Sequence, residues 1–153
     1  MRILVQRVAR AKVEVGERTT GAIGPGLLLL VGFGAGDTER LIRPAAEKVL
    51  NLRIFPDDAG NMNRSLLETG GGVLVVSQFT LYADARKGRR PSFTGALAPA
   101  DASRLCDAFI ATLRQLHPGG DIETGEFGAM MEVSLVNSGP VTIWLDSAEM
   151  GWA

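Results

Sequence analysis

"VVSQFTLYAD", residues 75–84, begins as a buried β-strand and then places polar side chains where apolar ones are expected. The apolar run over residues 73–76 is typical of a strand that is covered on both faces. Aromatic and aliphatic residues then carry β-forming character onward. The pattern therefore predicts one central strand over residues 73–83, with an amide and two hydroxyls in its middle.

These polar residues need partners. Strand alternation directs the side chains of Ser77 and Phe79 to one face and those of Gln78 and Thr80 to the other. An unpartnered buried polar group costs about 1–3 kcal/mol. The segment is therefore either a hydrogen-bonded network that fixes the strand or part of a functional site, and the pattern alone leaves both open.

Length and composition indicate a globular protein. The chain has 153 residues, of which 46% are hydrophobic and 22% charged, so we expect a single domain over residues 1–153 with a short tail after about residue 147. Its longest apolar run, residues 27–33, is too short to cross a bilayer, which takes about 20 residues. The start of the chain lacks a signal-peptide pattern. The lone Cys106 excludes an internal disulfide and fits a reducing compartment, so we expect a cytoplasmic protein with no membrane partner.

The order of predicted elements is typical of an α/β or α+β domain with helices covering one face of a sheet. Helices are expected over residues 36–52 and 98–116. In the first, Asp37 or Thr38 is the expected N-cap, and Pro44 moves the start of the regular helix to near Arg43. The expected strands cover residues 2–8, 11–15, 27–33, 52–55 and 73–83, and two more, joined or kinked at Gly139-Pro140, cover residues 130–146.

Several kinds of chemistry are excluded. One histidine and one cysteine do not make an ordinary zinc site, which takes three or four Cys, His or carboxylate ligands. His117 precedes the helix-stopping Pro118, where an imidazole usually interacts with the helix C-terminus, so we do not expect a catalytic base there. Cys106 lies about 16 Å from it along one helix, too far for a nucleophile–base pair. The glycine-rich stretch at residues 32–37 matches no phosphate-loop motif. We expect no metal and no cofactor.

Two further stretches attract attention. The first is a cluster of cations within residues 85–93, which is either a solvated loop or a loop that contacts phosphates; its members are Arg86, Lys87, Arg89 and Arg90. The second is Gly139-Pro140, in an apolar strand context. Proline cannot donate to a strand ladder, so it indicates an edge, a bulge or a cis turn. The pattern alone favours a strand end, because only about one X–Pro bond in twenty is cis.

Together these motifs resemble one family. "SQFTLYAD", "RKGRRPSFTGA" and "NSGPVT", with "LRIF" and the opening "QRV", are similar to the D-aminoacyl-tRNA deacylases, also described as D-tyrosyl-tRNA deacylases. The resemblance covers essentially the whole chain, and the paired SQxT and GPxT motifs are specific at this separation. The chain departs from the family at three places. Members usually carry an acidic residue at the position of Ser138 and an Asp near Met130, and they lack a proline at the position of Pro44.

The resemblance implies a homodimer that hydrolyses the ester between a D-amino acid, or glycine, and the terminal adenosine of tRNA, and that rejects L-amino acids sterically. It implies a single α/β (α+β) domain with mixed and antiparallel sheets in layered β/β/α order. It also implies that a cis Gly139-Pro140 peptide enters the partner's pocket. Three groups of site residues follow: Ser77, Gln78, Phe79 and Thr80 for catalysis, with the Phe79 N–H at the oxyanion; Asn137, Gly139, Pro140, Thr142 and Met131 for substrate binding and chiral selection; and Arg86, Lys87, Arg89 and Arg90 for tRNA.

Two alternatives remain at this point. A hydrolase of this kind uses either a positioned water or Thr80 as an acyl-enzyme nucleophile, and nothing nearby in the sequence activates Thr80. A member of another class, a non-catalytic RNA-binding module, would keep Ser77–Thr80 for structural reasons.

Overall fold

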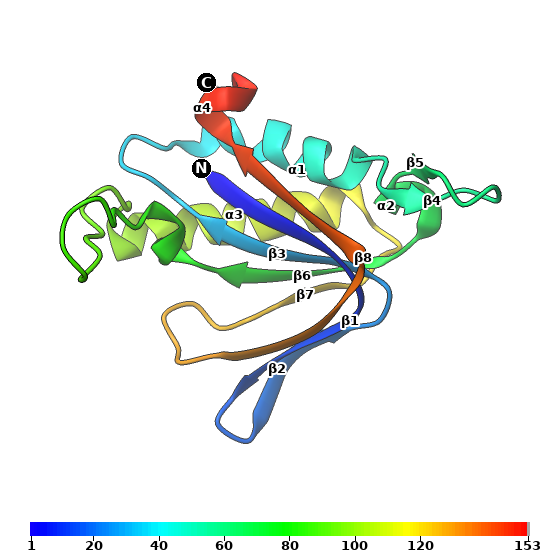
Figure 1. Ribbon diagram of the computed structural model, residues 1–153, viewed down its shortest axis with the longest axis horizontal. Coiled ribbons are helices and arrows are strands. Elements are labelled where there is room, and N and C mark those ends of the chain that lie inside the picture. The colour runs from blue at the N-terminus through cyan, green and yellow to red at the C-terminus, as the bar shows by residue number, and fades with distance from the viewer. Residues whose placement is uncertain (153) are drawn as a thin grey trace.

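The structure is a computed structural model that describes residues 1–152 (Figure 1). Its main sheet has the strand order β2-β1-β3-β6-β7. Strand β8 lies outside this order and pairs with β1 along most of the length of β1. Strands β3, β6 and β7 are parallel, whereas β1 is antiparallel to all of its neighbours. The strands are β1 (Arg2–Val15), β2 (Arg18–Ile23), β3 (Gly26–Gly32), β6 (Gly72–Ser77), β7 (Ile122–Thr124) and β8 (Glu132–Asp146), and β4 (Phe55–Pro56) pairs with β5 (Met62–Arg64) in a small separate hairpin.

Two long helices, α1 (Ile42–Asn51) and α3 (Pro99–Leu116), lie on one face of the main sheet (Figure 1). Shorter pieces connect the elements: the 3₁₀ turns η1 (Glu39–Leu41) and η2 (Phe79–Tyr82), and the one-turn helices α2 (Leu66–Thr69) and α4 (Ser147–Met150). Leu105, Phe109 and Leu113 form a buried apolar stripe on α3. Burial of these three side chains stabilises the fold by about 1.5–3 kcal/mol each.

The sheet separates two apolar clusters, which explains why β3 and β6 read as continuous apolar runs. Leu27 and Leu29 of β3 face the helices, whereas Leu28 faces the opposite cluster. In that second cluster, the far half of β1, β2 and the first half of β8 curl over the sheet (Figure 1). The result is a β/β/α layering of one mixed sheet, so the predicted fold class is confirmed.

The structure corrects several element boundaries. Residues 2–15 form one long strand with a bulge rather than two short strands, and β2 and β7 were not predicted. Only Phe55 of the expected 52–55 strand is in a ladder. The central strand ends at Ser77 instead of continuing to residue 83. Residues 147–150, expected in the tail, form α4, and Trp152 after it is buried.

The first helix begins where Pro44 allows it to begin. Helix α1 starts at Ile42, so Pro44 occupies its first turn, where a missing N–H costs little. Neither of the expected caps forms: Thr38 makes no capping hydrogen bond, and the Asp37 carboxylate instead accepts from the Gly34 N–H at 2.7 Å. In the described chain, no helix combines the length and the apolar character that a membrane span requires.

Candidate active site

The predicted catalytic residues lie on a tight turn, not along a strand. Strand β6 ends at Ser77, and the Gln78 N–H still donates to the Val31 oxygen at 2.7 Å before the chain turns into η2. The turn lies very close to β3: a Cβ on Gly32 would be 2.7 Å from the Gln78 oxygen. The predicted division of these side chains between two strand faces is therefore wrong. We call residues 77–82 the site turn.

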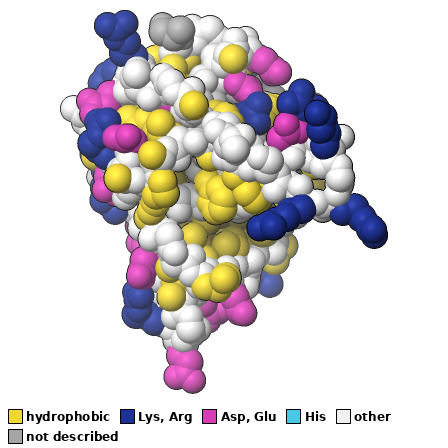
Figure 2. All heavy atoms as spheres, turned by 90° about the vertical axis from the view of Figure 1, so that its left-hand side faces the viewer, with side chains coloured by type: hydrophobic (Ala, Val, Ile, Leu, Met, Phe, Trp, Pro, Cys, Tyr) yellow, Lys and Arg dark blue, Asp and Glu magenta, His cyan; other side chains and the backbone are white. Residues whose placement is uncertain are grey.

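A pocket of about 730 Å³ opens beside the site turn, at the carboxyl ends of the parallel strands β3 and β6. Ligands of α/β sheets commonly bind at this edge. Figure 2 shows hydrophobic side chains gathered in the middle of this face, with Lys and Arg side chains beside them. The lining comes from four regions: the end of β3, the site turn, residues 93–102 and residues 127–133.

The lining of this pocket carries no charged side chain, and Ser77 and Gln78 are its only polar side chains. The described residues that line the pocket thus include no His, Asp, Glu, Lys or Arg side chain. The pocket can bind a ligand through its shape and through backbone N–H and C=O groups. Phe79 is the first residue of η2, and the first N–H groups of a helical turn have no partner within the turn.

Gln78 and Thr80 act as a pair within the turn. The Gln78 amide donates to the Thr80 hydroxyl, which does not line the pocket. A threonine nucleophile needs a base that accepts its proton, and an amide N–H is a donor. The contact thus fits a role for Thr80 in orienting the Gln78 side chain. Phe79 is 57% exposed and packs edge-on against Phe93, with ring centroids 5.1 Å apart.

The opposite wall of the pocket is the loop between β7 and β8. Met131 lines the pocket, and its sulfur occupies the space beside Gly125, where a Cβ would be 2.6 Å away. An ion pair at 2.5 Å between Arg18 of β2 and Glu126 ties this loop to the sheet. Met130 is 90% exposed at the pocket rim.

The second motif interrupts β8. Asn137 pairs with Val8 and Thr142 pairs with Gln6, so the four residues between them protrude opposite the single residue Arg7. We call residues 138–141 the β8 excursion. The Asn137 side chain closes its base, because its amide donates to the Thr142 hydroxyl and its oxygen accepts from the Val141 N–H, both at 2.8 Å.

Within the excursion the Gly139-Pro140 peptide bond is cis, and both residues are exposed. Arg7 holds the excursion from β1: its Nε donates to the Ser138 oxygen at 2.9 Å, and its Nη1 donates to the Ile54 oxygen. None of residues 137–142 lines the pocket. The structure thus brings Ser77, Gln78, Phe79 and Met131 together, whereas the excursion belongs to a different part of the same chain.

Comparisons with known proteins show the family of this chain. A family model described as D-Tyr-tRNA(Tyr) deacylase matches residues 4–146. The chain belongs to this family. A D-aminoacyl-tRNA deacylase of Roseiflexus sp. (strain RS-1) is 60% identical, over 97% of this chain and 94% of its own length. One of Thermomicrobium roseum is 59% identical, over 98% and 96%.

Solved structures of related chains share the fold of the deacylase family. A structure titled "c-Myc DNA Unwinding Element Binding Protein" matches with a TM-score of 0.91 and 39% identity, over 96% of this chain and 99% of that chain. A "probable eukaryotic D-amino acid tRNA deacylase" matches with a TM-score of 0.83 over 94% and 97%, and at 20% identity it shows the fold alone. The resemblance predicted from the sequence is confirmed.

The departures from the deacylase family pattern are compatible with the geometry. Ser138 contributes its backbone oxygen to Arg7, a contact that any residue can supply. Met130 points out to solvent. Sequence reasoning assigned no role to Arg7, because β1 also carries Arg2, Arg10 and Lys12 and nothing in its pattern distinguishes Arg7 from them.

The expected tRNA-binding residues of this deacylase family member lie on an exposed loop directly after the site turn. Arg86 is engaged by Asp84, with contacts of 2.8 and 2.7 Å, and these hydrogen bonds lower the pKa of Asp84 to about 2. Among the described residues, no carboxylate forms an ion pair with Lys87, Arg89 or Arg90. Within the described loop, these three cations thus differ from Arg86, whose guanidinium is paired.

The remaining reactive side chains lie outside the site. His117 is buried, with its Nε2 2.9 Å from the Gly71 oxygen. Cys106 lies on the buried face of α3, where desolvation raises its pKa to about 11. A thiol with so high a pKa is a poor nucleophile. In the part of the chain that the structure describes, no three side chains of His, Cys, Asp or Glu are grouped to hold a metal ion.

Proposed function

We propose that this protein hydrolyses the ester bond between a D-amino acid and the 3′-terminal adenosine of tRNA. The observation that carries the proposal is the pocket beside the site turn, which is lined without a charged side chain, in a chain that belongs to the D-Tyr-tRNA(Tyr) deacylase family. An uncharged pocket suits an aminoacyl ester, because this substrate is already activated and needs to be positioned more than it needs a strong base.

In the proposed reaction a water molecule adds to the ester carbonyl carbon. The Phe79 N–H stabilises the developing oxyanion, and the Ser77 and Gln78 side chains line the space where the ester lies. The carbon–oxygen bond to the ribose then breaks, and the ribose oxygen leaves as a hydroxyl with the proton released by the attacking water. The neighbouring ribose hydroxyl assists the water. Positioning of this kind supplies several kcal/mol of the rate enhancement.

The selection against L-substrates requires a second copy of the chain. The β8 excursion presents Gly139 and Pro140 to solvent and does not reach the pocket of its own chain. In a homodimer it would enter the partner's pocket, where its main-chain atoms would lie against the substrate α-carbon. An L-side chain would then clash with backbone that cannot move aside, whereas glycine, which has no side chain, would be accepted. Asn137 and Thr142 hold the excursion in shape, and Met131 lines the pocket that receives it.

The loop with Lys87, Arg89 and Arg90 would contact the tRNA backbone while the terminal adenosine enters the pocket. The tRNA substrate and the lone buried cysteine fit the cytoplasm as the place of action. A non-catalytic RNA-binding module remains the alternative of another class, and it predicts binding without ester cleavage.

The deciding experiment is a deacylation assay on matched D- and L-tyrosyl-tRNA. We expect release of D-tyrosine and no measurable release of L-tyrosine. A protein that binds both tRNAs and cleaves neither is the binding module, and equal cleavage of both contradicts chiral selection. A burst of tyrosine release with a trapped Thr80 ester would replace the positioned water by an acyl-enzyme.

The dimeric arrangement is tested by complementation. Ala102→Trp fills the pocket that Ala102 lines, and Gly139→Val damages the excursion, because a Cβ there would be 2.9 Å from the Arg7 guanidinium. Each variant alone is expected to be inactive. After mixing and subunit exchange, half of the dimers contain one intact pocket that faces one intact excursion, so activity returns to about a quarter of the parental value. Mixtures that stay inactive, although exchange is verified by mass spectrometry, would contradict the arrangement.

A further inference from the structure

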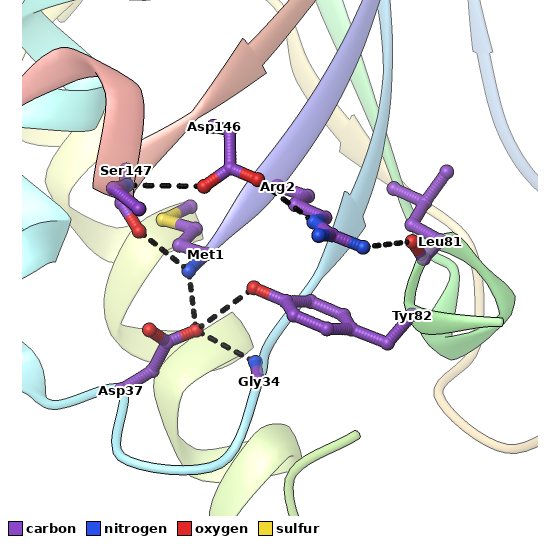
Figure 3. A network of polar contacts seen from close by, with 9 residues as sticks. Met1, Arg2, Gly34, Asp37, Leu81, Tyr82, Asp146 and Ser147 are labelled. Atoms are coloured by element: carbon purple, nitrogen blue, oxygen red, sulfur yellow. Dashed lines mark hydrogen bonds and ion pairs between the residues drawn. The ribbon is translucent and has the colours of Figure 1, made fainter. Parts of the chain in front are cut away.

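Arg2, at the start of the first strand, contacts the site turn and also pairs with Asp146 at the end of the last strand. Figure 3 shows Arg2 reaching from the start of β1 to the turn, with Tyr82 of the turn beside it and Asp37 beyond. None of these three side chains lines the pocket. Any effect that they have on the reaction must therefore act through the position of the turn.

Arg2 makes the central contacts. Its Nη1 donates to the Leu81 oxygen at 2.8 Å, and its Nε donates to Asp146 at the end of β8 at 2.9 Å. Its guanidinium also lies over two aromatic rings, 4.4 Å from the centroid of Tyr82 and 5.6 Å from that of Trp144. A planar guanidinium can make all of these contacts at once, whereas a lysine ammonium makes fewer.

Tyr82 supplies the second point of support. A Cβ on Gly34 would lie 2.4 Å from the Tyr82 ring, so this ring fits only against a glycine. Its hydroxyl is 3.5 Å from the Asp37 carboxylate, which also pairs with the Met1 ammonium at 2.5 Å. Burial, together with the nearby Asp37 charge, raises the pKa of Tyr82, so its hydroxyl remains a donor to the carboxylate.

The turn needs this outside support because its own hydrogen bonds are few. Within and around η2, the Leu81 N–H donates to the Gln78 oxygen at 3.3 Å, and the Ala83 N–H donates to the Thr80 oxygen at 3.0 Å. Short 3₁₀ turns have poor hydrogen-bond geometry and are easily displaced. A guanidinium that fixes the Leu81 oxygen also limits rotation of the preceding peptide units, including the one that carries the Phe79 N–H.

We infer that Arg2 is a positioning residue for the deacylation: by holding the Leu81 oxygen and the Tyr82 ring, it aims the Phe79 N–H and the Gln78 side chain into the pocket. This inference rests on the proposed function. The contacts to Asp146 and Trp144 hold the guanidinium itself in place, so the two ends of the chain jointly determine the geometry of the turn.

The test compares Arg2→Met, Arg2→Lys and the control Ser147→Ala. Methionine keeps the length of the arginine stem without its donors, and it is preferred to alanine because a small second residue favours removal of Met1. Ser147 accepts from the Met1 ammonium at 2.8 Å, so its replacement weakens the same network without touching the site turn. Single-turnover and steady-state deacylation of D-tyrosyl-tRNA, thermal unfolding, and amide hydrogen exchange of the segment 77–83 are measured for each protein.

For Arg2→Met we expect a fall in kcat of about 10- to 100-fold with KM unchanged within about two-fold, because the turn is misplaced while the tRNA-binding loop is intact. Exchange in the segment 77–83 should be faster. Arg2→Lys should recover part of the lost kcat, and Ser147→Ala should lower the unfolding temperature while leaving both kcat and exchange at the turn at parental values.

Two results would overturn the inference. One is an Arg2→Met variant that is folded and turns over at the parental rate. The other is an equal loss of kcat in Ser147→Ala, which would mean that the whole network acts only through stability. A parent protein that does not cleave D-tyrosyl-tRNA overturns the proposed function itself, and the inference falls with it.

Discussion

The site turn and the β8 excursion both interrupt a strand, and they do so in opposite ways. The site turn ends β6 and bends back over Gly32, so it forms one wall of a concave pocket. The excursion leaves β8 and returns to it, so Gly139 and Pro140 project outward with no pocket of their own. One chain therefore carries a concave pocket and an exposed excursion that does not reach it.

Distorting the β8 excursion is expected to have the largest effect on the rate of deacylation. Gly139 has φ +135°, which L side chains rarely adopt, and a Cβ there would meet Arg7. Gly139→Val should lower kcat/KM for D-tyrosyl-tRNA by about 100-fold or more. Gly60→Val is the matched control, since Gly60 also has a positive φ, of +83°, but nothing lies within 4 Å of its Cβ position. Parental activity in a folded Gly139→Val variant would separate the excursion from the site.

Displacing the site turn, which forms one wall of the pocket, should have the next largest effect on the rate. In Gly32→Ala the new Cβ would be 2.7 Å from the Gln78 oxygen, so the site turn must move away from β3. We expect kcat to fall by about 10- to 50-fold, while the molar mass by light scattering stays at the parental value. Gly24→Ala is the control, because its Cβ would have no neighbour within 4 Å. If both variants keep the parental kcat, contact between β3 and the turn does not determine the geometry of the site.

Removing the positive charges of the loop that follows the site turn is expected to have the third largest effect, on tRNA binding. The loop with Lys87, Arg89 and Arg90 follows the site turn, so replacing all three by glutamine should weaken tRNA binding about ten-fold and flatten its salt dependence by about two to three units of slope. Arg86→Gln should matter less, because Asp84 already engages that guanidinium. Replacing Arg43, Lys48 and Arg53 removes the same charge from exposed positions elsewhere. An equal loss of slope in that control would point to net charge rather than to a tRNA-binding loop.

The smallest effect is expected at Thr80. Thr80→Val removes the acceptor for the Gln78 amide and should reduce kcat about three- to ten-fold, whereas Thr80→Ser keeps the hydroxyl and should stay near the parental rate. Both are read from single-turnover rates at saturating enzyme. Complete inactivity of Thr80→Val with a fully active Thr80→Ser would instead favour a nucleophilic hydroxyl.

Sequence periodicity predicted the elements that local pattern alone determines. The predicted strand over residues 27–33 and the predicted helix over residues 98–116 agree with β3 and α3 within one residue at each end. The very short β7 offered too little pattern to be seen. The end of β6 was missed for a different reason: Phe79, Leu81 and Tyr82 favour strands by type, but contacts with Gly32 and Arg2 turn the chain away.

Part of the candidate site was predicted from the sequence, and part was not. The residue pattern alone left the polar segment open between a structural network and a site. The family resemblance assigned Ser77, Gln78 and Phe79 to a site, and in the structure all three line a pocket. The roles of Arg7 and Arg2 depend on contacts with residues distant in the sequence, 131 positions away for Ser138 and 79 for Leu81, and no local pattern reports such contacts. The pairing of Arg86 with Asp84 is local, but the sequence analysis did not predict it and grouped Arg86 with the other cations of the loop.

The pairing of the first strand with the last has a consequence for how the chain becomes active during its synthesis. Strand β1 lies between β3 and β8, and Arg2 pairs with Asp146 across 144 residues. A nascent chain can pair β1 with β2 and β3 early, but it keeps an open β1 edge until β8 emerges, and such non-local pairing forms slowly. Arg2 lacks its Asp146 partner until then. Emergence of the final strand therefore closes the open edge of the sheet and completes the support of the site turn in the same step.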